Sequence, residues 1–392
     1  MKILTFSTLY PNAARPNHGI FVETRLRHLL QSGNVEARVV APVPWFPSSN
    51  PRYGRYAAFA RAPRQEQRNG IEVIHPQYLS LPKIGMTVAP FLMAAGAQSV
   101  MASMVRGEWD FDIIDAHYFY PDGVAAAILG EKLNKPVVIT ARGTDINLLP
   151  QFAFPRRMIL WAAKRAAAVI TVSAGLKTVL AQLGVDSSNI SVLRNGVDTR
   201  LFHPTDREAQ RARLGLAGTV LLMVGNLVAL KGHEIMLRAL PDFPDACLLI
   251  VGEGEEEQTL RTLAGALGIE DRVRFLGAMP QEQLPAYYGA ADALLLASSR
   301  EGWPNVLLEA MACGTPVVST CVGGTSEVVA APEAGVLMTE RSAPGMLEAL
   351  NRLFSNYPDR NLTRRYAERF SWDDTTRGQL ALFSRILQRV TI

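Results

Sequence analysis

The chain has 392 residues, of which 48% are hydrophobic and 19% are charged, and its formal net charge is +4. This length allows two domains, each with its own core, and the composition is typical of a soluble globular protein. The small charge gives no reason to expect a nucleic-acid partner, and three irregularly spaced cysteines exclude a disulfide framework or a cysteine zinc site. The opening residues predict a strand rather than a signal peptide, so we expect a cytoplasmic protein.

The first predicted elements are a strand at Lys2–Ser7, a loop at Pro11–Gly19 and a helix at Ile20–Gln31. Gly19 at the start of this helix would let backbone amides approach a ligand phosphate without a Cβ in the way. Further strands are predicted at Val35–Ala41, Ile113–Asp115, the apolar run after Pro136, and Ala168–Ser173.

Two segments of this half combine basic and aromatic or apolar residues. Residues 52–70 carry five arginines interleaved with Tyr53, Tyr56 and Phe59, and residues 156–165 carry four cations around Met158–Trp161. Such segments can lie on anionic lipid headgroups, and a solvated surface loop is the alternative. Single-stranded nucleic acid uses similar chemistry, but we do not expect it here.

One uncharged stretch, Ile84–Val105, is long enough to span a bilayer. It also contains glycine, proline, glutamine and serine residues, and its hydrophobicity comes mainly from alanine and methionine. We therefore expect a packed or interfacial helix rather than a transmembrane one.

Polar residues follow two of the predicted strands. His117 is expected just past Ile113–Asp115, and Arg142 and Asp145 follow the strand after Pro136. An arginine beside an aspartate at the edge of an α/β sheet could position an acceptor or a donor phosphate. Asp110-Phe111-Asp112 has the form of a metal-binding pattern, but it precedes its strand, so no metal is expected there.

The C-terminal half again alternates strands and helices. Strands are predicted at Val220–Gly225, Leu248–Gly252 and Arg272–Gly277, with a helix at His233–Ala239 that Lys231 precedes. Gly252-Glu253-Gly254 is an incomplete dinucleotide fingerprint, because the third glycine position holds a glutamate, so NAD is not expected.

The stretch Ser298–Pro316 predicts a loop and a short helix between the strand Ala293–Ala297 and a following apolar run. The helix should begin near Pro304 or Asn305, where proline suits a first position and asparagine can cap. Fully helical spacing would separate Glu301 and Glu309 by about 12 Å, the reach from sugar to ribose in a nucleotide sugar. Amides at the helix start would favour a diphosphate between them.

Glu301 and Glu309, followed by Ala-Met, Gly-Thr-Pro and Val317, resemble the signature of family 4 retaining glycosyltransferases. The resemblance implies an α/β protein of the GT-B fold, with two Rossmann-like domains facing each other across a cleft and a C-terminal helix that crosses back to the first. The domains would be 1–196 for the acceptor and 197–372 for the donor, with the helix at 373–392. Val192–Asp198 resembles the last strand of the first domain and the crossing point, and Asn195-Gly196 is itself a turn signal.

The resemblance also implies roles for the site residues. Glu301 would bind donor-sugar hydroxyls, Glu309 the ribose hydroxyls and Lys231 the diphosphate. The family commonly has arginine at Asn226, and Arg300 could replace that missing cation. Many members have histidine at Arg142, whereas members of exopolysaccharide or teichuronic-acid-type assembly share the arginine, which only donates hydrogen bonds and stays charged. The implied donor-binding residues are Gly19, Gly225, Asn226, Lys231, Phe275, Arg300, Glu301, Gly302, Trp303, Pro304, Asn305, Val306 and Glu309, and the catalytic candidates are Glu301, Lys231, Arg142, Asp145 and His117.

These patterns predict a retaining, metal-independent glycosyltransferase without a cofactor. The donor would be a UDP- or GDP-sugar, and the acceptor a glycan or lipid-linked molecule of surface polysaccharide synthesis. The protein would be cytoplasmic, with possible contact with anionic lipid at the inner face of the membrane. The alternatives are another GT-B enzyme, such as a nucleotide-sugar epimerase, and a non-catalytic nucleotide-sugar-binding subunit, which the departures at Asn226 and Arg142 keep open.

Overall fold

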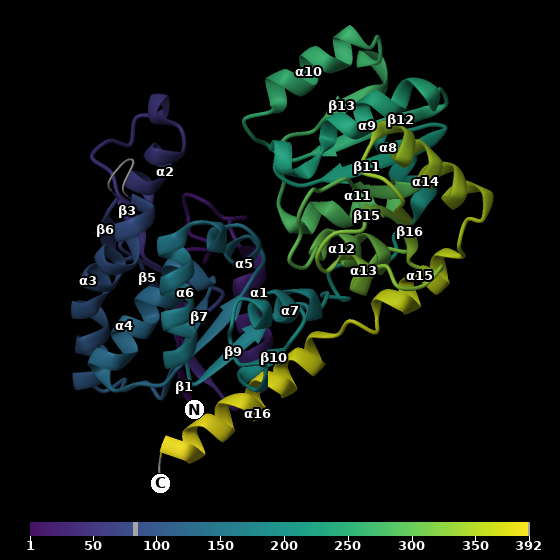
Figure 1. Cartoon of the computed structure of the whole chain (residues 1–392). Helices are drawn as coiled ribbons and strands as arrows, with labels where there is room; N and C mark the ends of the chain where they lie inside the picture. Colours follow the sequence, from purple (N-terminus) through teal and green to yellow (C-terminus); the bar gives the residue numbers. More distant parts are fainter. Residues whose placement is uncertain (81–84, 391–392) are drawn as a thin grey trace. The chain divides into compact units, whose positions relative to one another are not determined.

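The computed structural model describes residues 1–80 and 85–390, and the chain forms two compact units (Figure 1). Unit 1 comprises Met1–Arg194 together with Asp373–Ile392, and unit 2 comprises Asn195–Trp372. The last helix therefore belongs to the unit that contains the N-terminus.

Within the described residues, unit 1 has an eight-stranded sheet in the order β10-β9-β8-β7-β1-β2-β5-β4. All neighbours pair in parallel except β4 and β5, which are antiparallel. The direction of winding reverses at β1, which lies between β2 and β7. The strands of the sheet are β1 (Lys2–Phe6), β2 (Glu36–Val40), β4 (Gln65–Arg68), β5 (Ile71–Ile74), β7 (Ile113–His117), β8 (Val137–Ala141), β9 (Ala168–Thr171) and β10 (Ile190–Val192).

Helices cover both faces of this sheet, because a parallel sheet is buried on both sides. One face packs against α1 and α16, whose Leu26 and Phe383 join Ile3 of β1 in one buried apolar cluster. A separate parallel pair, β3 (Val43–Trp45) and β6 (Gln77–Leu79), lies outside the main sheet. The helices of unit 1 are α1 (Ile20–Gln31), α2 (Arg55–Arg61), α3 (Gly85–Arg106), α4 (Val124–Leu133), α5 (Thr144–Asn147), α6 (Ala153–Arg165), α7 (Ala174–Gln182) and α16 (Trp372–Val390).

The apolar stretch predicted at Ile84–Val105 forms α3, although Ile84 itself lies outside the described residues. In the described part of the chain, α3 is the one helix long and apolar enough to cross a membrane. Buried residues recur along α3 at helical spacing, among them Met93, Ala97, Met101 and Met104. The helix contacts α4, α6 and β6. One face of α3 is therefore packed on unit 1, whereas Met86 and Phe91 are exposed.

Unit 2 has a six-stranded parallel sheet, counted over its described residues, in the order β13-β12-β11-β14-β15-β16. Numbered within the unit, this is the 3-2-1-4-5-6 order of a Rossmann fold. Its strands are β11 (Thr219–Val224), β12 (Ala246–Val251), β13 (Val273–Phe275), β14 (Ala293–Leu296), β15 (Val317–Thr320) and β16 (Gly335–Met338), and its helices are α8 (Arg207–Leu214), α9 (His233–Ala239), α10 (Glu257–Ala266), α11 (Leu284–Ala290), α12 (Asn305–Ala312), α13 (Thr325–Val328), α14 (Ala343–Ser355) and α15 (Arg360–Ala367).

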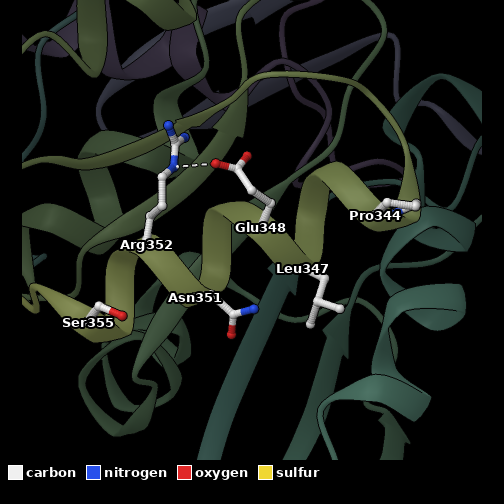
Figure 2. Close-up of a pocket in the computed structure, with 6 residues that line it drawn as sticks. All are labelled: Pro344, Leu347, Glu348, Asn351, Arg352 and Ser355. Carbon is white, nitrogen blue, oxygen red and sulfur yellow. Dashed lines mark ion pairs between the residues drawn. The ribbon is translucent and has the colours of Figure 1, made fainter.

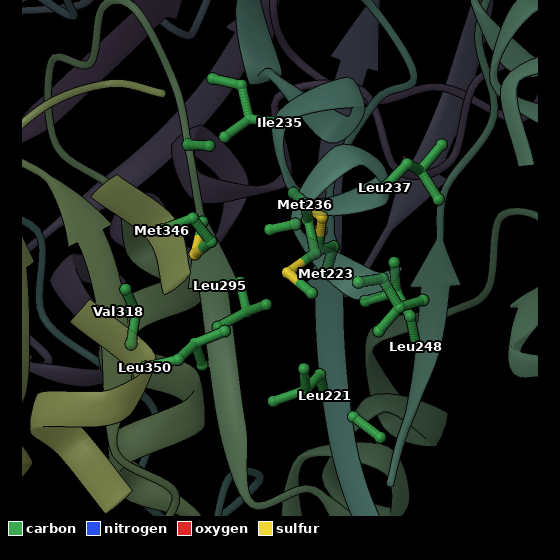
Figure 3. Close-up of a cluster of buried hydrophobic side chains, with 14 of the residues drawn as sticks. Leu221, Met223, Ile235, Met236, Leu237, Leu248, Leu295, Val318, Met346 and Leu350 are labelled. Atoms are coloured by element: carbon green, nitrogen blue, oxygen red, sulfur yellow. The ribbon is translucent and has the colours of Figure 1, made fainter. Parts of the chain in front are cut away.

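The core of unit 2 explains why its strands read as continuous apolar runs (Figure 3). Leu221 and Met223 point from alternate positions of β11 into one buried cluster, with Met236 of α9 and Met346 and Leu350 of α14. The intervening residues of β11 are equally buried and face the other side of the sheet.

Two predicted elements need correction. The strand expected at Val192–Asp198 ends at Val192, which pairs with Thr171, the last residue of its partner β9. The final helix was expected to begin at residue 373 and begins one residue earlier, at Trp372.

Candidate functional site

The predicted donor residues gather where parallel strands of unit 2 end. Gly225 follows β11, Phe275 ends β13, and the segment from Arg300 to Val306 follows β14. Since β11 and β14 are neighbours from which the chain winds in opposite directions, their carboxyl ends form a topological switch point. Ligands of open α/β sheets bind at such a point.

An ion pair occupies this switch point. Lys231 lies at the end of a 3₁₀ turn, Ala229–Lys231, after β11, and its Nζ is 2.7 Å from Oε1 of Glu301. The two side chains are 24% and 11% exposed, so each is held partly out of water. The backbone joins the same loops, because the amide of Ser299 donates to the carbonyl of Leu230 at 2.9 Å. One ammonium and one carboxylate are thus brought together from positions 70 residues apart.

The loop after β15 holds the backbone of Glu301 in place. Gly323 has φ +54°, and a Cβ at this position would stand 1.9 Å from the carbonyl oxygen of Glu301. Only glycine combines this left-handed conformation with such close contact. The loop after β15 therefore holds the backbone of Glu301, and Lys231 in the loop after β11 holds its carboxylate.

Helix α12 begins at Asn305 rather than being capped by it. Pro304 occupies the capping position without a side-chain hydrogen bond, and Oδ1 of Asn305 instead accepts from Nδ2 of Asn195 at 3.2 Å. Gly302, Trp303 and Pro304 are buried immediately before the helix, and Asn305 and Val306 are half-buried. The amides of this first turn lie directly after Glu301, where the helix dipole favours an anion.

Glu309 is buried inside α12 and has a partner that the sequence did not indicate. The hydroxyl of Tyr288, in α11, donates to Oε2 of Glu309 at 2.8 Å, and Nε2 of Gln281 is 3.5 Å from Oε1. Burial raises the pKa of Glu309 to about 7, although the hydrogen bond from Tyr288 opposes this shift. Tyr288 is 21 positions from Glu309, so no local pattern could have connected them.

The other predicted donor residues surround this edge or lie in unit 1. Asn226 is exposed after Gly225, and Arg300 is half-buried beside Glu301. The ring of Phe275 is covered on one side by the guanidinium of Arg261, 4.4 Å from its centroid. Gly19 begins α1 in unit 1 with φ +59°, where a Cβ would meet the carbonyl oxygen of Leu9 at 2.0 Å.

In unit 1, His117, Arg142 and Asp145 lie at the carboxyl ends of β7 and β8. His117 was expected just past its strand and is instead the last residue of β7, because its backbone pairs with Thr140 of β8. Nη2 of Arg142 contacts Nδ1 of His117. Asp145 is fully buried and accepts hydrogen bonds from the amides of Phe119 and Gly143, both at 2.7 Å, so its carboxylate holds these loops together. Burial raises the pKa of Asp145, an effect that these amides oppose.

A further pocket of about 590 Å³ lies elsewhere in unit 2 (Figure 2). It is lined by one face of α14, including Leu347 and Asn351, and its charged residues, Glu348 and Arg352, form an ion pair at 3.0 Å. It contains no predicted site residue, and its charges already neutralise each other.

Comparison with known proteins agrees with this arrangement. Residues 89–201 match the family described as Glycosyltransferase Family 4, and residues 206–370 match that described as Glycosyl transferases group 1. The chain is a family 4 glycosyltransferase. Over 368 residues, the glycosyltransferase is 33% identical to a Bacillus subtilis (strain 168) protein provisionally named teichuronic acid biosynthesis glycosyltransferase TuaC, and the match covers 90% of this chain and 89% of the relative. It is 32% identical to the D-inositol 3-phosphate glycosyltransferase of Acidothermus cellulolyticus, with 77% and 73% of the two chains covered.

Solved structures identify the fold of the glycosyltransferase. Sucrose-phosphate synthase from Thermosynechococcus elongatus superposes with a TM-score of 0.81 at 21% identity, over 99% of both chains. Anabaena HepE, crystallised with UDP, superposes with a TM-score of 0.74 at 22% identity, over 98% of this chain and 100% of HepE. The predicted GT-B fold, with parallel α/β sheets, is confirmed.

Proposed function

We propose that this glycosyltransferase transfers a hexose, with retention of configuration and without a metal, from a UDP-sugar to a lipid-linked glycan acceptor of surface polysaccharide. The observation that carries the proposal is the convergence of Lys231 and Glu301, 2.7 Å apart, at the switch point of unit 2. We propose UDP rather than GDP as the nucleotide of the donor because structures of HepE contain UDP and UDP-glucose. The polysaccharide role is supported by the name of the Bacillus subtilis relative.

The residues at this edge have the charges that departure of a nucleoside diphosphate requires. As the bond between the sugar and the diphosphate breaks, negative charge grows on the phosphate oxygens. The ammonium of Lys231 and the amides from Gly302 to Val306 would stabilise that charge, which removes the need for a metal. Glu301, already anchored by Lys231, would accept hydrogen bonds from donor-sugar hydroxyls, and Glu309 would accept from the ribose hydroxyls.

For retention, the acceptor oxygen attacks the sugar carbon on the face from which the diphosphate leaves. The acceptor's oxygen–carbon bond forms, the carbon–phosphate oxygen bond breaks, and the acceptor proton passes to the leaving phosphate. Glu301 is paired with Lys231, so we do not propose it as a covalent nucleophile. Arg142 and His117, at the strand ends of unit 1, are the candidates for holding the acceptor.

A basic aromatic face on unit 1 supports a lipid-linked acceptor and a place at the inner surface of the cell membrane. Residues 43–64, 85–106 and 148–165 carry nine arginines and lysines and no acidic residue. Seven of the nine exposed large hydrophobic residues in the described chain lie on these segments or on β6, which pairs with β3. They are Trp45, Tyr53, Tyr56, Leu79, Met86, Phe91 and Phe152. Aromatic side chains with surrounding cations are the chemistry that binds anionic membrane surfaces.

Calorimetry with UDP-, GDP- and ADP-sugars tests the donor site. We expect a UDP-sugar to bind, and Lys231→Ala to weaken binding by about tenfold or more, about 1.4 kcal/mol. Lys132→Ala, which removes a cation from the surface of α4 in unit 1, is the control and should bind as the parent does. The donor assignment fails if no nucleotide sugar binds or if Lys231→Ala has no effect. The anomeric configuration of the product tests retention, and activity in excess chelator tests metal independence.

Vesicle sedimentation tests the membrane proposal. The protein should sediment with phosphatidylglycerol-containing vesicles but not with neutral ones, and Phe152→Ser combined with Arg157→Ser should weaken this binding severalfold. Leu362→Ser, an equally exposed apolar residue in unit 2, is the matched control. Equal binding of all three proteins would contradict a role for the basic aromatic face.

A further inference from the structure

A line of buried polar side chains leads from the last helix to Arg142. Gln379 of α16 is 1% exposed, although it lies within the apolar contact between α16 and the sheet. Its Oε1 accepts from Nε of Arg25 on α1 at 2.9 Å, and its Nε2 donates to Oδ2 of Asp115 on β7 at 2.8 Å. Since arginine only donates and a carboxylate only accepts, these two partners fix the orientation of the amide.

The next member of the line is His117, which is also 1% exposed. Its Nε2 is 3.1 Å from the same Oδ2 of Asp115, and its Nδ1 faces Nη2 of Arg142. Because the guanidinium can only donate, Nδ1 must be the acceptor, and the single ring proton must be on Nε2. Burial lowers the pKa of His117 to about 4, which agrees with a neutral ring.

The carboxylate of Asp115 accepts from Nε2 and so favours the same tautomer. Burial opposes its ionisation, whereas the hydrogen bond from His117 and the charges of Arg25 and Arg142 favour it. In this arrangement an ionised aspartate contacts a neutral histidine, which in turn contacts a charged arginine. Phe21 of α1 supports the guanidinium from another side, with its ring centroid 5.2 Å from Cζ of Arg142.

Stability alone is a poor reason for this network. Arg25 and Asp115 are buried, and within the described residues Nη2 of Arg25 and Oδ1 of Asp115 have no hydrogen-bond partner. Partly satisfied buried charges cost free energy, and apolar residues of similar volume are often neutral or stabilising in such places. This cost suggests that the network has a role other than holding α16 on unit 1.

We propose that Gln379 and Asp115 are positioning residues for Arg142. Gln379 orients Asp115, Asp115 fixes the Nε2–H tautomer of His117, and Nδ1 of His117 then holds the guanidinium of Arg142 at the end of β8. This inference rests on the proposed function, in which Arg142 contacts the acceptor. Gln379, on the C-terminal helix and 264 positions along the chain from Asp115, would then help to position a site residue of unit 1.

Nitrogen NMR of the full chain with labelled histidine tests the tautomer directly. The signal of His117, identified by its loss in His117→Gln, should show a proton on Nε2 in the parent protein. In Gln379→Met this preference should weaken, whereas Gln388→Met, an exposed glutamine of the same helix, should leave it unchanged. A proton on Nδ1 in the parent protein would overturn the proposal, and this measurement needs no variant that might fail to fold.

Kinetics separate positioning from simple docking of the helix. Gln379→Met should lower kcat/KM for the acceptor by about tenfold or more in the folded enzyme, with the Kd of the donor unchanged, because the donor residues Lys231 and Glu301 belong to unit 2. In His117→Asn the amide oxygen lies near the position of Nδ1 and can replace it as acceptor, whereas in the longer His117→Gln the amide lies near the position of Nε2. His117→Asn should therefore retain more activity. Full activity in folded Gln379→Met would refute the positioning role. If the parent protein transfers no sugar, the proposed function fails, and the tautomer measurement still decides the network.

Discussion

Replacing Glu309 with glutamine should make the glycosyltransferase more stable and a weaker donor binder. Burial raises the pKa of Glu309 from an ordinary 4.5 to about 7. A group whose folded pKa is raised contributes stability that is present below 4.5 and is lost as the pH rises through 7. At about 1.4 kcal/mol per pH unit, the raised pKa lowers the free energy of unfolding by about 3 kcal/mol at pH 8, where the group ionises in both states. At pH 5, where it ionises mainly in the unfolded chain, the loss is about 1 kcal/mol.

Glu309→Gln removes this cost, because the amide cannot ionise and its oxygen can still accept from the hydroxyl of Tyr288. Urea unfolding followed by tryptophan fluorescence should show a gain of about 3 kcal/mol at pH 8 that falls to about 1 kcal/mol at pH 5. Glu282→Gln, an exposed glutamate of the same unit, is the control. A gain of equal size at both pH values, or a loss at pH 8, would refute the reasoning. Weaker nucleotide-sugar binding by the stabilised variant would show that the carboxylate is kept for its ligand.

Two other changes probe the same edge. Tyr288→Phe removes the 2.8 Å hydrogen bond to Glu309, so the pKa of Glu309 should rise further. The free energy of unfolding should fall by about 1–3 kcal/mol at pH 8 and by less at pH 5. Equal losses at the two pH values would contradict this. Gly323→Ala places a Cβ 1.9 Å from the carbonyl oxygen of Glu301 and should reduce donor affinity by more than tenfold in calorimetry. Gly268→Ala, with φ +63° and open space around it, carries the same backbone strain and should bind donor normally, so a parallel loss in both variants would count against the contact.

Local patterns predicted the regular elements of the chain well. The helices at Ile20–Gln31 and His233–Ala239 have the predicted bounds, because a glycine precedes each and apolar residues recur at helical spacing. Five short strands, β3, β4, β5, β6 and β16, were not predicted, since strands of three or four residues depend on their partners rather than on their own sequences.

The candidate site was predictable in its residues but not in its contacts. Glu301 and Lys231 were identified separately, mainly from the resemblance to family 4 glycosyltransferases, whereas their ion pair depends on β11 and β14 being neighbours. His117 and Arg142 were predicted, but their contacts with Asp115 and Gln379 were not, because these residues lie on elements brought together only by the sheet and the last helix. The sequence therefore shows which side chains are reactive, whereas the order of the strands determines which of them contact each other.

The return of α16 to unit 1 has a consequence for how the chain folds as it is synthesised. When residues 1–194 leave the ribosome, Leu382, Phe383 and Ile386, which complete their apolar cluster, have not yet been made. Arg25 and Asp115 at that stage also lack Gln379, their shared partner. Unit 2, whose residues are contiguous, can therefore complete its fold before unit 1, whose apolar cluster stays incomplete until α16 has been synthesised. A chain truncated before residue 373 should therefore contain a folded unit 2 beside an incomplete unit 1 that chaperones recognise.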